Sequence, residues 1–286
     1  MAAVFVIFLR EGVEASMIVS ILLAYLDRIG QRRHFRDVLA GVGAALLLAA
    51  GGGVAAYLTI RTYAGSRVQT IFETATYAVA AVVLTGMTLW MASHARTLSK
   101  ELRARTDAAV SRGERLGLFL LAFQAVGREG LETAVFTLAI VFASGTRGAL
   151  LGGSLGLALS LVIAVVVYRL GRRINLAVFF TTVGALLIVF AAGLVADTVQ
   201  NLQQLGWVHV LDRPLWDTSR QLSESSALGD VFHTFVGYAA RPTALQLACY
   251  LAYLAAILAA FWQRNRRHVP TVTAPAAAVS AAAGRT

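Results

Sequence analysis

The sequence predicts an all-α integral membrane protein with seven transmembrane helices, arranged as two inverted three-helix repeats and a seventh helix. Three observations support this fold class: the apolar composition, the recurrence of long apolar runs, and the placement of basic residues between those runs. Of 286 residues, 58% are hydrophobic and only 14% are charged, with a mean hydropathy of +0.69. A soluble domain carries about 25% charged residues, so the composition excludes a water-soluble enzyme fold.

Seven apolar runs reach the length of about 20 residues that an α-helix needs to cross the hydrocarbon core. The first run has no leading positive charge and is interrupted by Arg10 and Glu11, so it is predicted to be a retained span and not a signal peptide. The runs cover residues 2–26, 38–60, 70–93, 117–143, 148–168, 176–199 and 243–262.

The 25 basic residues predict the orientation of these spans. Seventeen lie in the connections after the first, third and fifth runs and after the seventh, six lie on the opposite side, and Arg10 and Arg128 lie inside runs. Short cytoplasmic connections are enriched in Lys and Arg, so the N-terminus is predicted outside and the C-terminus in the cytoplasm. The net charge of +10 then records topology, and no nucleic-acid partner is predicted, because basic residues are not interleaved with aromatic ones.

The chain divides accordingly into six parts. A single lysine among the basic residues, together with abundant alanine, indicates a GC-rich bacterial source and hence a bacterial plasma membrane. The parts are a first three-helix repeat (1–95), a cytoplasmic loop (96–116), a second three-helix repeat (117–200), an external loop (201–242), a seventh helix with a basic end (243–268) and a disordered cytoplasmic tail (269–286).

Two charged clusters in the middle of spans carry the chemistry. The first run contains Arg10, Glu11 and Glu14, and the fourth contains the same pattern as Arg128, Glu129 and Glu132. A rise of about 1.5 Å per residue places both clusters near the bilayer midplane. One interpretation is structural, with each arginine neutralising the glutamate four residues later. That pairing does not account for Glu11 and Glu129. A charge at the bilayer centre costs about 2.5–3.5 kcal/mol even on insertion scales, so these charges are not explained by packing alone.

The spacing of the glutamates favours a cation site. Two residues three positions apart share a helix face, so each span presents two carboxylates together. If the two faces converge, four carboxylates and two guanidinium groups leave an excess of negative charge, and oxygen ligands prefer hard cations.

A glycine lies at the centre of each cluster, Gly12 in the first and Gly130 in the second. Such a glycine permits close approach of another helix, or lowers the cost of local unwinding that would free carbonyl groups for an ion. Small residues at every fourth position, Gly41, Ala45, Ala49 and Gly53 in one run and Gly148, Gly152 and Gly156 in another, predict close helix packing.

The repetition of the motif after 118 residues predicts an internal repeat. Each copy begins a block of three spans, and because three is odd, the second block enters the membrane from the opposite side. Inverted repeats are typical of transporters whose site lies at the midplane between the two halves. Glu73 and Asp197 are predicted nearer the outer face, where they form an acidic funnel for a cation or reach water as interface residues.

The two Arg-Glu-Gly-x-Glu motifs in a seven-span chain resemble the oxidase-dependent iron permease family, which includes fungal high-affinity iron permeases and bacterial EfeU-type transporters. Further similarity lies in Leu89-Trp90-Met91, Phe190-Ala191-Ala192-Gly193-Leu194 and Pro214-Leu215-Trp216-Asp217-Thr218-Ser219. The resemblance implies iron uptake, with the metal oxidised to the ferric form outside the membrane.

Carried over to this sequence, the resemblance implies that Glu11, Glu14, Glu129 and Glu132 bind iron and that Arg10 and Arg128 orient them. Iron is then a transported substrate and no cofactor is permanently bound. An extracytoplasmic iron oxidase or delivery protein is the implied partner, beside the lipid bilayer, and a homo-oligomer is compatible with the sequence.

Two other functions use the same residues. A proton-coupled carrier for another divalent metal would have a similar acidic midplane. An intramembrane enzyme with a carboxylate-bridged metal pair is disfavoured, because bundle di-iron sites use Glu-x-x-His and both motifs here are Glu-x-x-Glu.

Overall fold

The computed structural model describes residues 2–94, 98–111, 115–144, 146–170, 176–223 and 226–267, and within these ranges the regular structure is helical. This confirms the predicted all-α class for the described residues, and the predicted disordered tail lies outside them. Each of the seven predicted runs coincides to within a residue with part of one long helix. These helices are α1 (Ala2–Arg28), α2 (Phe35–Arg61), α3 (Arg67–His94), α5 (Arg115–Ser144), α6 (Thr146–Leu170), α7 (Leu176–Gln204) and α9 (Ala244–Arg267).

Five of the long helices, α2, α3, α6, α7 and α9, are apolar enough along their length to cross a membrane. The other two, α1 and α5, have 27 and 30 residues, which is sufficient length. They differ because each carries a three-charge cluster near its middle. The composition that separates α1 and α5 from the other helices is therefore the candidate site itself.

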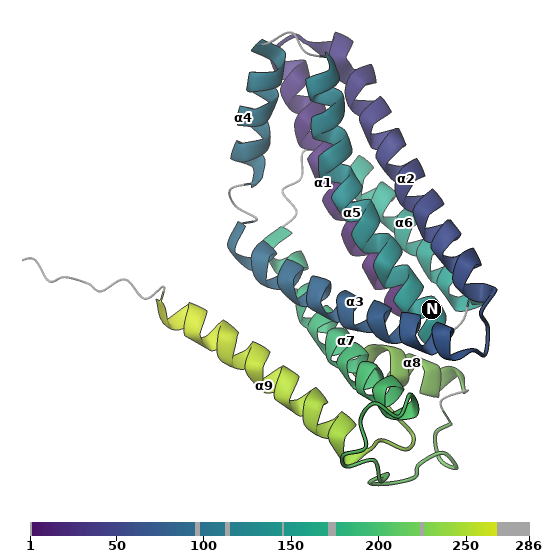
Figure 1. The fold of residues 1–286 in the computed structure, drawn as a ribbon. Coiled ribbons are helices and arrows are strands. Elements are labelled where there is room, and N and C mark those ends of the chain that lie inside the picture. Colours follow the sequence, from purple (N-terminus) through teal and green to yellow (C-terminus); the bar gives the residue numbers. More distant parts are fainter. Residues whose placement is uncertain are drawn as a thin grey trace, which may run out of the picture.

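The long helices form two groups, seen in Figure 1. Helices α1, α2, α5 and α6 lie side by side, with extensive contacts between α1 and α6 and between α2 and α5. Helices α3, α7 and α9 form the second group, in which α7 packs against both α3 and α9. The groups meet where α3 contacts α5, and α1 also contacts α5 directly. The two charged helices thus lie next to each other.

Small residues form the closest helix contacts, as the sequence predicts. A Cβ atom placed on Gly156 of α6 would lie 2.4 Å from the carbonyl oxygen of Phe5 in α1. A Cβ atom on Gly41 of α2 would lie 2.4 Å from the carbonyl oxygen of Phe119 in α5. Side chains cannot be accommodated at such distances, so glycine at these two positions permits the backbones of the paired helices to approach each other.

A short helix, α4 (Leu98–Ser111), lies within the predicted loop 96–116 and is an element that the apolar runs do not reveal. Its Leu102 is buried in an apolar cluster with residues of α1, α2 and α5, and its Thr106 is fully buried. The hydroxyl of Tyr25 in α1 donates a hydrogen bond of 2.5 Å to Asp107. Helix α4 therefore folds back along α1 and α5.

The connection 201–242 contains a second short helix, α8 (Ala227–Val236), which packs against α7, α1 and α5. Gly237 ends α8 with a left-handed backbone (φ 68°) that favours glycine. Its backbone also approaches Gly193 of α7 so closely that a Cβ on either residue would lie less than 3.0 Å from the other. This contact holds α8 on the end of the bundle where the α2–α3 connection lies (Figure 1).

The rest of that connection is fixed by pairing with the start of α9. An isolated bridge joins Pro214 to Thr243, and an ion pair of 2.6 Å joins Asp217 to Arg241. The hydrogen bond from Arg241, helped by bonds from Ser219, holds the pKa of Asp217 below its usual range. The bridge and the ion pair join the connection to the start of α9.

Candidate cation site between α1 and α5

Both motifs lie within unbroken helix, so the backbone carbonyls of Gly12 and Gly130 remain in the helical ladder. Two roles are predicted for these glycines, close helix packing and local unwinding, and in the structure they permit close approach of a neighbouring helix. A Cβ on Gly12 would lie 2.2 Å from Oγ of Ser160 in α6, and a Cβ on Gly130 would lie 2.8 Å from Cβ of Ala49 in α2. Gly12 therefore lets α1 pack closely against α6, and Gly130 lets α5 pack closely against α2. The glutamate side chains lie on a different face of each helix.

Carboxylates from the two motifs converge between α1 and α5. Glu11, Glu14 and Glu129 each offer an oxygen atom, and these three atoms lie within 4.8 Å of one another. All three residues are buried, with at most 3% of their surface exposed. Glu132 lies outside this trio and is joined to it through Arg128, whose Nε is 3.4 Å from Glu132 and 3.2 Å from Glu129.

The cluster has more acceptor atoms than donors. Both oxygens of Glu11 and one oxygen each of Glu14, Glu129 and Glu132 are buried without a hydrogen-bond partner among the described residues. A buried carboxylate oxygen without a partner is costly, and several of them so close together repel one another. Either a cation among the oxygens or protons on them would relieve this repulsion, so the arrangement is chemically suited to a cation site.

The two arginines differ in their surroundings. The side chain of Arg10 is only 2% exposed, and its guanidinium lies 3.5 Å from the carboxylate of Glu11. The spacing of four predicts an ion pair of Arg10 with Glu14, but among the described residues Arg10 pairs with Glu11. The side chain of Arg128 is 45% exposed, pairs with Glu132 as predicted, and its guanidinium lies 4.8 Å above the ring of Trp90 in α3. The site is thus closed on the Arg10 side and open on the Arg128 side.

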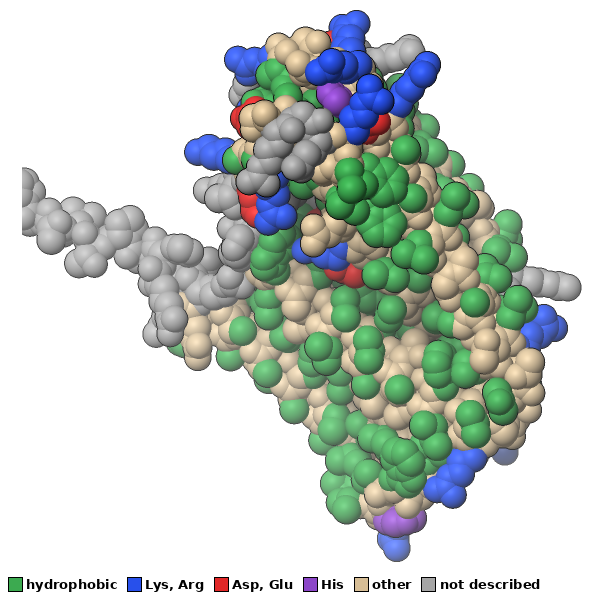
Figure 2. Space-filling view, turned by 45° about the horizontal axis from the view of Figure 1, so that its top comes forward, with side chains coloured by type: hydrophobic (Ala, Val, Ile, Leu, Met, Phe, Trp, Pro, Cys, Tyr) green, Lys and Arg blue, Asp and Glu red, His purple; other side chains and the backbone are tan. Residues whose placement is uncertain are grey.

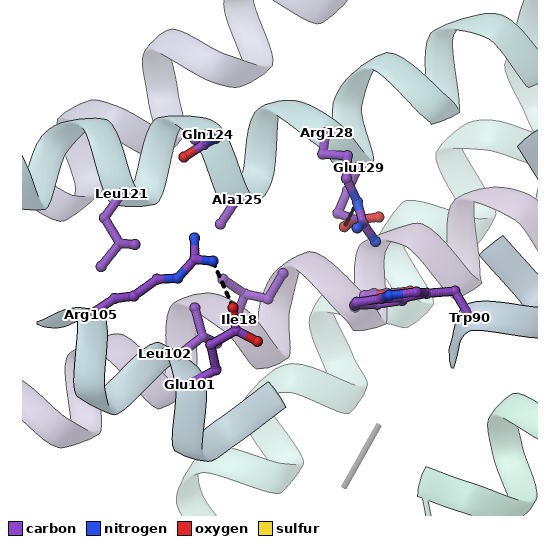
Figure 3. A pocket seen from close by; sticks show the side chains of 11 residues that line it. Ile18, Trp90, Glu101, Leu102, Arg105, Leu121, Gln124, Ala125, Arg128 and Glu129 are labelled. Atoms are coloured by element: carbon purple, nitrogen blue, oxygen red, sulfur yellow. Dashed lines mark hydrogen bonds and ion pairs between the residues drawn. The ribbon is translucent and has the colours of Figure 1, made fainter. Parts of the chain in front are cut away.

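A cavity of about 220 Å³ reaches the glutamates from the open side. Figure 3 shows Arg128, Glu129 and Trp90 at one end of it and Glu101 and Arg105 of α4 at the other. A second cavity, on the other side of Trp90 and Arg128, is lined by Glu132 together with Val83, Gly86 and Met87 of α3.

Sequence reasoning did not assign Trp90, Glu101 or Gln124 to the site, although all three line the first cavity. Trp90 has no charge that would mark it as a site residue, and its one signal is its place in the Leu89-Trp90-Met91 segment that carries the family resemblance. Glu101 and Arg105 do carry a signal, since their spacing of four is that of a helical ion pair, and this pair would have indicated a helix in the loop.

The predicted funnel residues lie away from the glutamate cluster. Glu73 is half-buried near the start of α3, where it accepts a hydrogen bond of 2.6 Å from Gln69. Asp197 is half-buried near the end of α7, which packs against α3. The start of α3 and the end of α7 lie toward the end of the bundle that α8 covers (Figure 1).

Long apolar helices around a buried carboxylate cluster are typical of an integral membrane protein with acidic groups inside its helical bundle. The comparison with known proteins gives the family. Residues 1–266 match the iron permease FTR1 family, and the chain belongs to it. Membership makes the chain a multi-pass membrane permease and not an enzyme, with iron as its transported substrate.

Curated relatives agree with this assignment along nearly the whole chain. The chain is 33% identical over 259 residues to the ferrous iron permease EfeU of Escherichia coli O6:K15:H31 (strain 536 / UPEC), covering 90% of this chain and 94% of that protein. The identity and coverage are the same for the ferrous iron permease EfeU of Shigella sonnei (strain Ss046). The chain is also 32% identical over 261 residues to the ferrous iron permease EfeU of Yersinia pestis, covering 90% of this chain and 92% of that protein. No solved structure matches the chain.

Proposed function

We propose that the chain imports iron across the plasma membrane through a midplane site formed by Glu11, Glu14, Glu129 and Glu132. The observation that carries the proposal is the convergence of buried carboxylate oxygens from two adjacent helices to within 4.8 Å. Carboxylate oxygens without other partners suit a hard cation. Arg10 and Arg128 orient the glutamates and limit the negative charge of the site.

Alternating access by two inverted repeats, α1–α3 and α5–α7, is part of the proposal. Exchanging the repeats maps the α1–α6 contact onto the α5–α2 contact, and these are the two most extensive helix contacts among the described residues. The same exchange relates the contact of Gly12 with Ser160 to that of Gly130 with Ala49. Packing that is preserved under the exchange supports two halves that rock about a shared site.

The orientation rests on the distribution of basic residues. Figure 2 shows most visible Lys and Arg side chains gathered at the end of the molecule where α4 and the α1–α2 connection lie, with hydrophobic side chains over most of the remaining face. That end is cytoplasmic by the positive-inside rule, which places the N-terminus and α8 outside. Iron then passes Glu73 and Asp197 before it exchanges its water for the midplane carboxylates.

Iron enters the site in the ferric form, after oxidation outside the membrane by a partner protein. The relatives are named as ferrous iron permeases, and oxidation before transport reconciles a ferrous supply with a site of hard oxygen donors. Uptake of ferrous iron should then depend on an external oxidase. Equal uptake rates with and without any oxidising partner would contradict this part of the proposal.

The central test replaces single carboxylates by their uncharged isosteres. We expect Glu11→Gln and Glu132→Gln to abolish the uptake of radioactive iron, because each removes a charged ligand without changing the shape of the side chain. The measurement is iron accumulation in cells, normalised to the amount of permease in the membrane.

Asp212→Asn is the matched control, since it makes the same change at an exposed residue outside the glutamate cluster, and it should transport iron normally. Competition with manganese and zinc tests the alternative of a carrier for another divalent metal. Normal iron uptake by both glutamine variants would overturn the proposal.

A further inference from the structure

The cavity beside Glu14 and Glu129 has an end that the motifs do not explain. It runs from the buried glutamates to α4, and Glu101 and Arg105 line it there (Figure 3). Glu14 is 1% exposed, and one of its two carboxylate oxygens is buried without a hydrogen-bond partner. The same cavity is therefore lined by Glu14 of the midplane cluster and by a second carboxylate on another helix.

On the opposite side the bundle is closed. Ile7 lies one turn before Glu11 in α1 and is 1% exposed, and Phe136 lies one turn after Glu132 in α5 and is fully buried. Both belong to an apolar cluster that also contains residues of α3 and α7. Together with the burial of Arg10, this apolar plug leaves the α4 side as the route along which a cavity reaches Glu14 and Glu129, whereas the second cavity reaches Glu132.

The wall of this route is mostly apolar, being formed by residues such as Ile18, Leu102 and Leu121. Besides Glu14 and Glu129, the side chains in it that offer an oxygen ligand are those of Gln124 and Glu101. A cation that leaves the midplane has no water-like environment along apolar surface, so it needs these oxygens as its next partners.

We propose that this cavity is the release half of the iron path and that Glu101 of α4 is the ligand that receives the cation from Glu14 and Glu129. The inference rests on the proposed function and names a ligand outside the two motifs. Arg105 holds Glu101 in a 2.6 Å ion pair until the cation displaces it. Both side chains are more than half exposed, and an exposed pair is weak, so the displacement costs little.

The position of Glu101 is fixed by its helix. Leu102, the next residue, is buried against α1 and α5, and the hydrogen bond from Tyr25 to Asp107 joins α4 to α1. Glu101 is thus held at the mouth of the cavity, with the predicted cytoplasm beyond it. An ion pair that only stabilised α4 would need no cavity behind it.

The first experiment tests the route. The chain has one cysteine, Cys249, which is replaced by serine. The substitution Gln124→Cys then introduces a single thiol that lines the cavity. We expect a membrane-impermeant maleimide to label it from the cytoplasmic face of inside-out vesicles and not from the outer face, and ferric iron to slow the labelling. Labelling from the outer face alone, or no labelling from the inner face, would overturn the route.

The second experiment tests Glu101. Glu101→Gln should lower the rate of iron uptake about tenfold while equilibrium binding of iron to the purified permease is kept, and Glu101→Asp should restore most of the rate. Asp212→Asn, at an exposed residue of the connection between α7 and α9, is again the control, and size-exclusion chromatography checks that each variant is folded. Uptake by Glu101→Gln equal to that of the control would overturn the role of Glu101.

Glu11→Gln separates this proposal from the one on which it rests. Glu11→Gln should no longer bind iron, whereas Glu101→Gln should still bind iron and release it more slowly. If Glu11→Gln binds iron as the unsubstituted protein does, the midplane site is wrong. If it loses binding and Glu101→Gln transports normally, only the release ligand is wrong.

Discussion

Arg10 and Arg128 occupy the same place in their motifs, yet burial makes them unequal. Arg10 is almost fully buried and compensates carboxylates that have few other partners, whereas nearly half of the Arg128 side chain is exposed and its charge is partly solvated. Removing one partner of a buried ion pair leaves an uncompensated charge, while exposed pairs contribute little. The stability of the fold should therefore depend on Arg10 far more than on Arg128.

We expect Arg10→Gln to destabilise the purified permease by about 3–5 kcal/mol, and Arg128→Gln by about 1 kcal/mol or less. Thermal unfolding in detergent, followed by circular dichroism, measures both. Arg10→Lys keeps the charge and should recover part of the loss. Equal destabilisation by the two glutamine variants would show that the difference in burial has no energetic consequence.

At the scale of single residues, the sequence predicts the convergence of carboxylates well and their partners poorly. Spacing places Glu11 with Glu14 and Glu129 with Glu132 on common helix faces, and charge in an apolar run marks them. The ion pair of Arg10 with Glu11 could not be predicted, because side-chain direction depends on the packing of α1 against α5 and α6. Glu101 reaches the site only through the fold of the chain, since α4 is distant in sequence from both motifs.

Among the helices, the seams between α1 and α6 and between α2 and α5 set how closely the charged helices are held. Gly41→Ala places a Cβ 2.4 Å from the Phe119 carbonyl oxygen, so α2 and α5 must move apart. We expect a loss of about 1–3 kcal/mol, as for other overpacked interiors. The measurement is the apparent Tm of the detergent-solubilised protein, together with its iron uptake.

Gly51→Ala on the same helix is the control for this prediction. Gly51 is exposed, and a Cβ there would meet nothing within 4 Å, so the substitution tests helix propensity alone. It should leave stability unchanged or raise it by up to about 1 kcal/mol. If it lowers the Tm as much as Gly41→Ala does, close packing is not the reason for glycine in the seam.

Element prediction from the sequence succeeds for long helices and fails for short ones. The seven long helices follow from apolar runs, and the row of small residues marks the faces that α2 and α6 bury. Helix α4 is polar, with a narrow buried stripe that includes Leu102 and Thr106, and α8 has only 10 residues. Neither has enough apolar length to be recognised without the helices against which it packs.

For the whole molecule, the charge distribution and the proposed repeat together predict that α1 and α5 cross the membrane. Both helices carry three charges at their centres. Because these groups are paired with one another inside the bundle, the free-energy cost of placing them in the membrane is lowered. A chain in which only α2, α3, α6, α7 and α9 crossed would expose the motifs to water on one side. The two topologies place particular loops on opposite sides of the membrane.

Single cysteines in the Cys249→Ser background distinguish these topologies. With seven crossings, Arg33→Cys is cytoplasmic, and both Tyr63→Cys and Arg213→Cys are external, because an odd number of membrane-crossing helices separates each of them from residue 33. An N-terminal tag should also be external. Labelling of intact cells with an impermeant maleimide, compared with inside-out vesicles, measures each position. With five crossings, Arg213→Cys and the tag would lie on the side of Arg33→Cys, and the midplane site, with its alternating access, would have no place in the molecule.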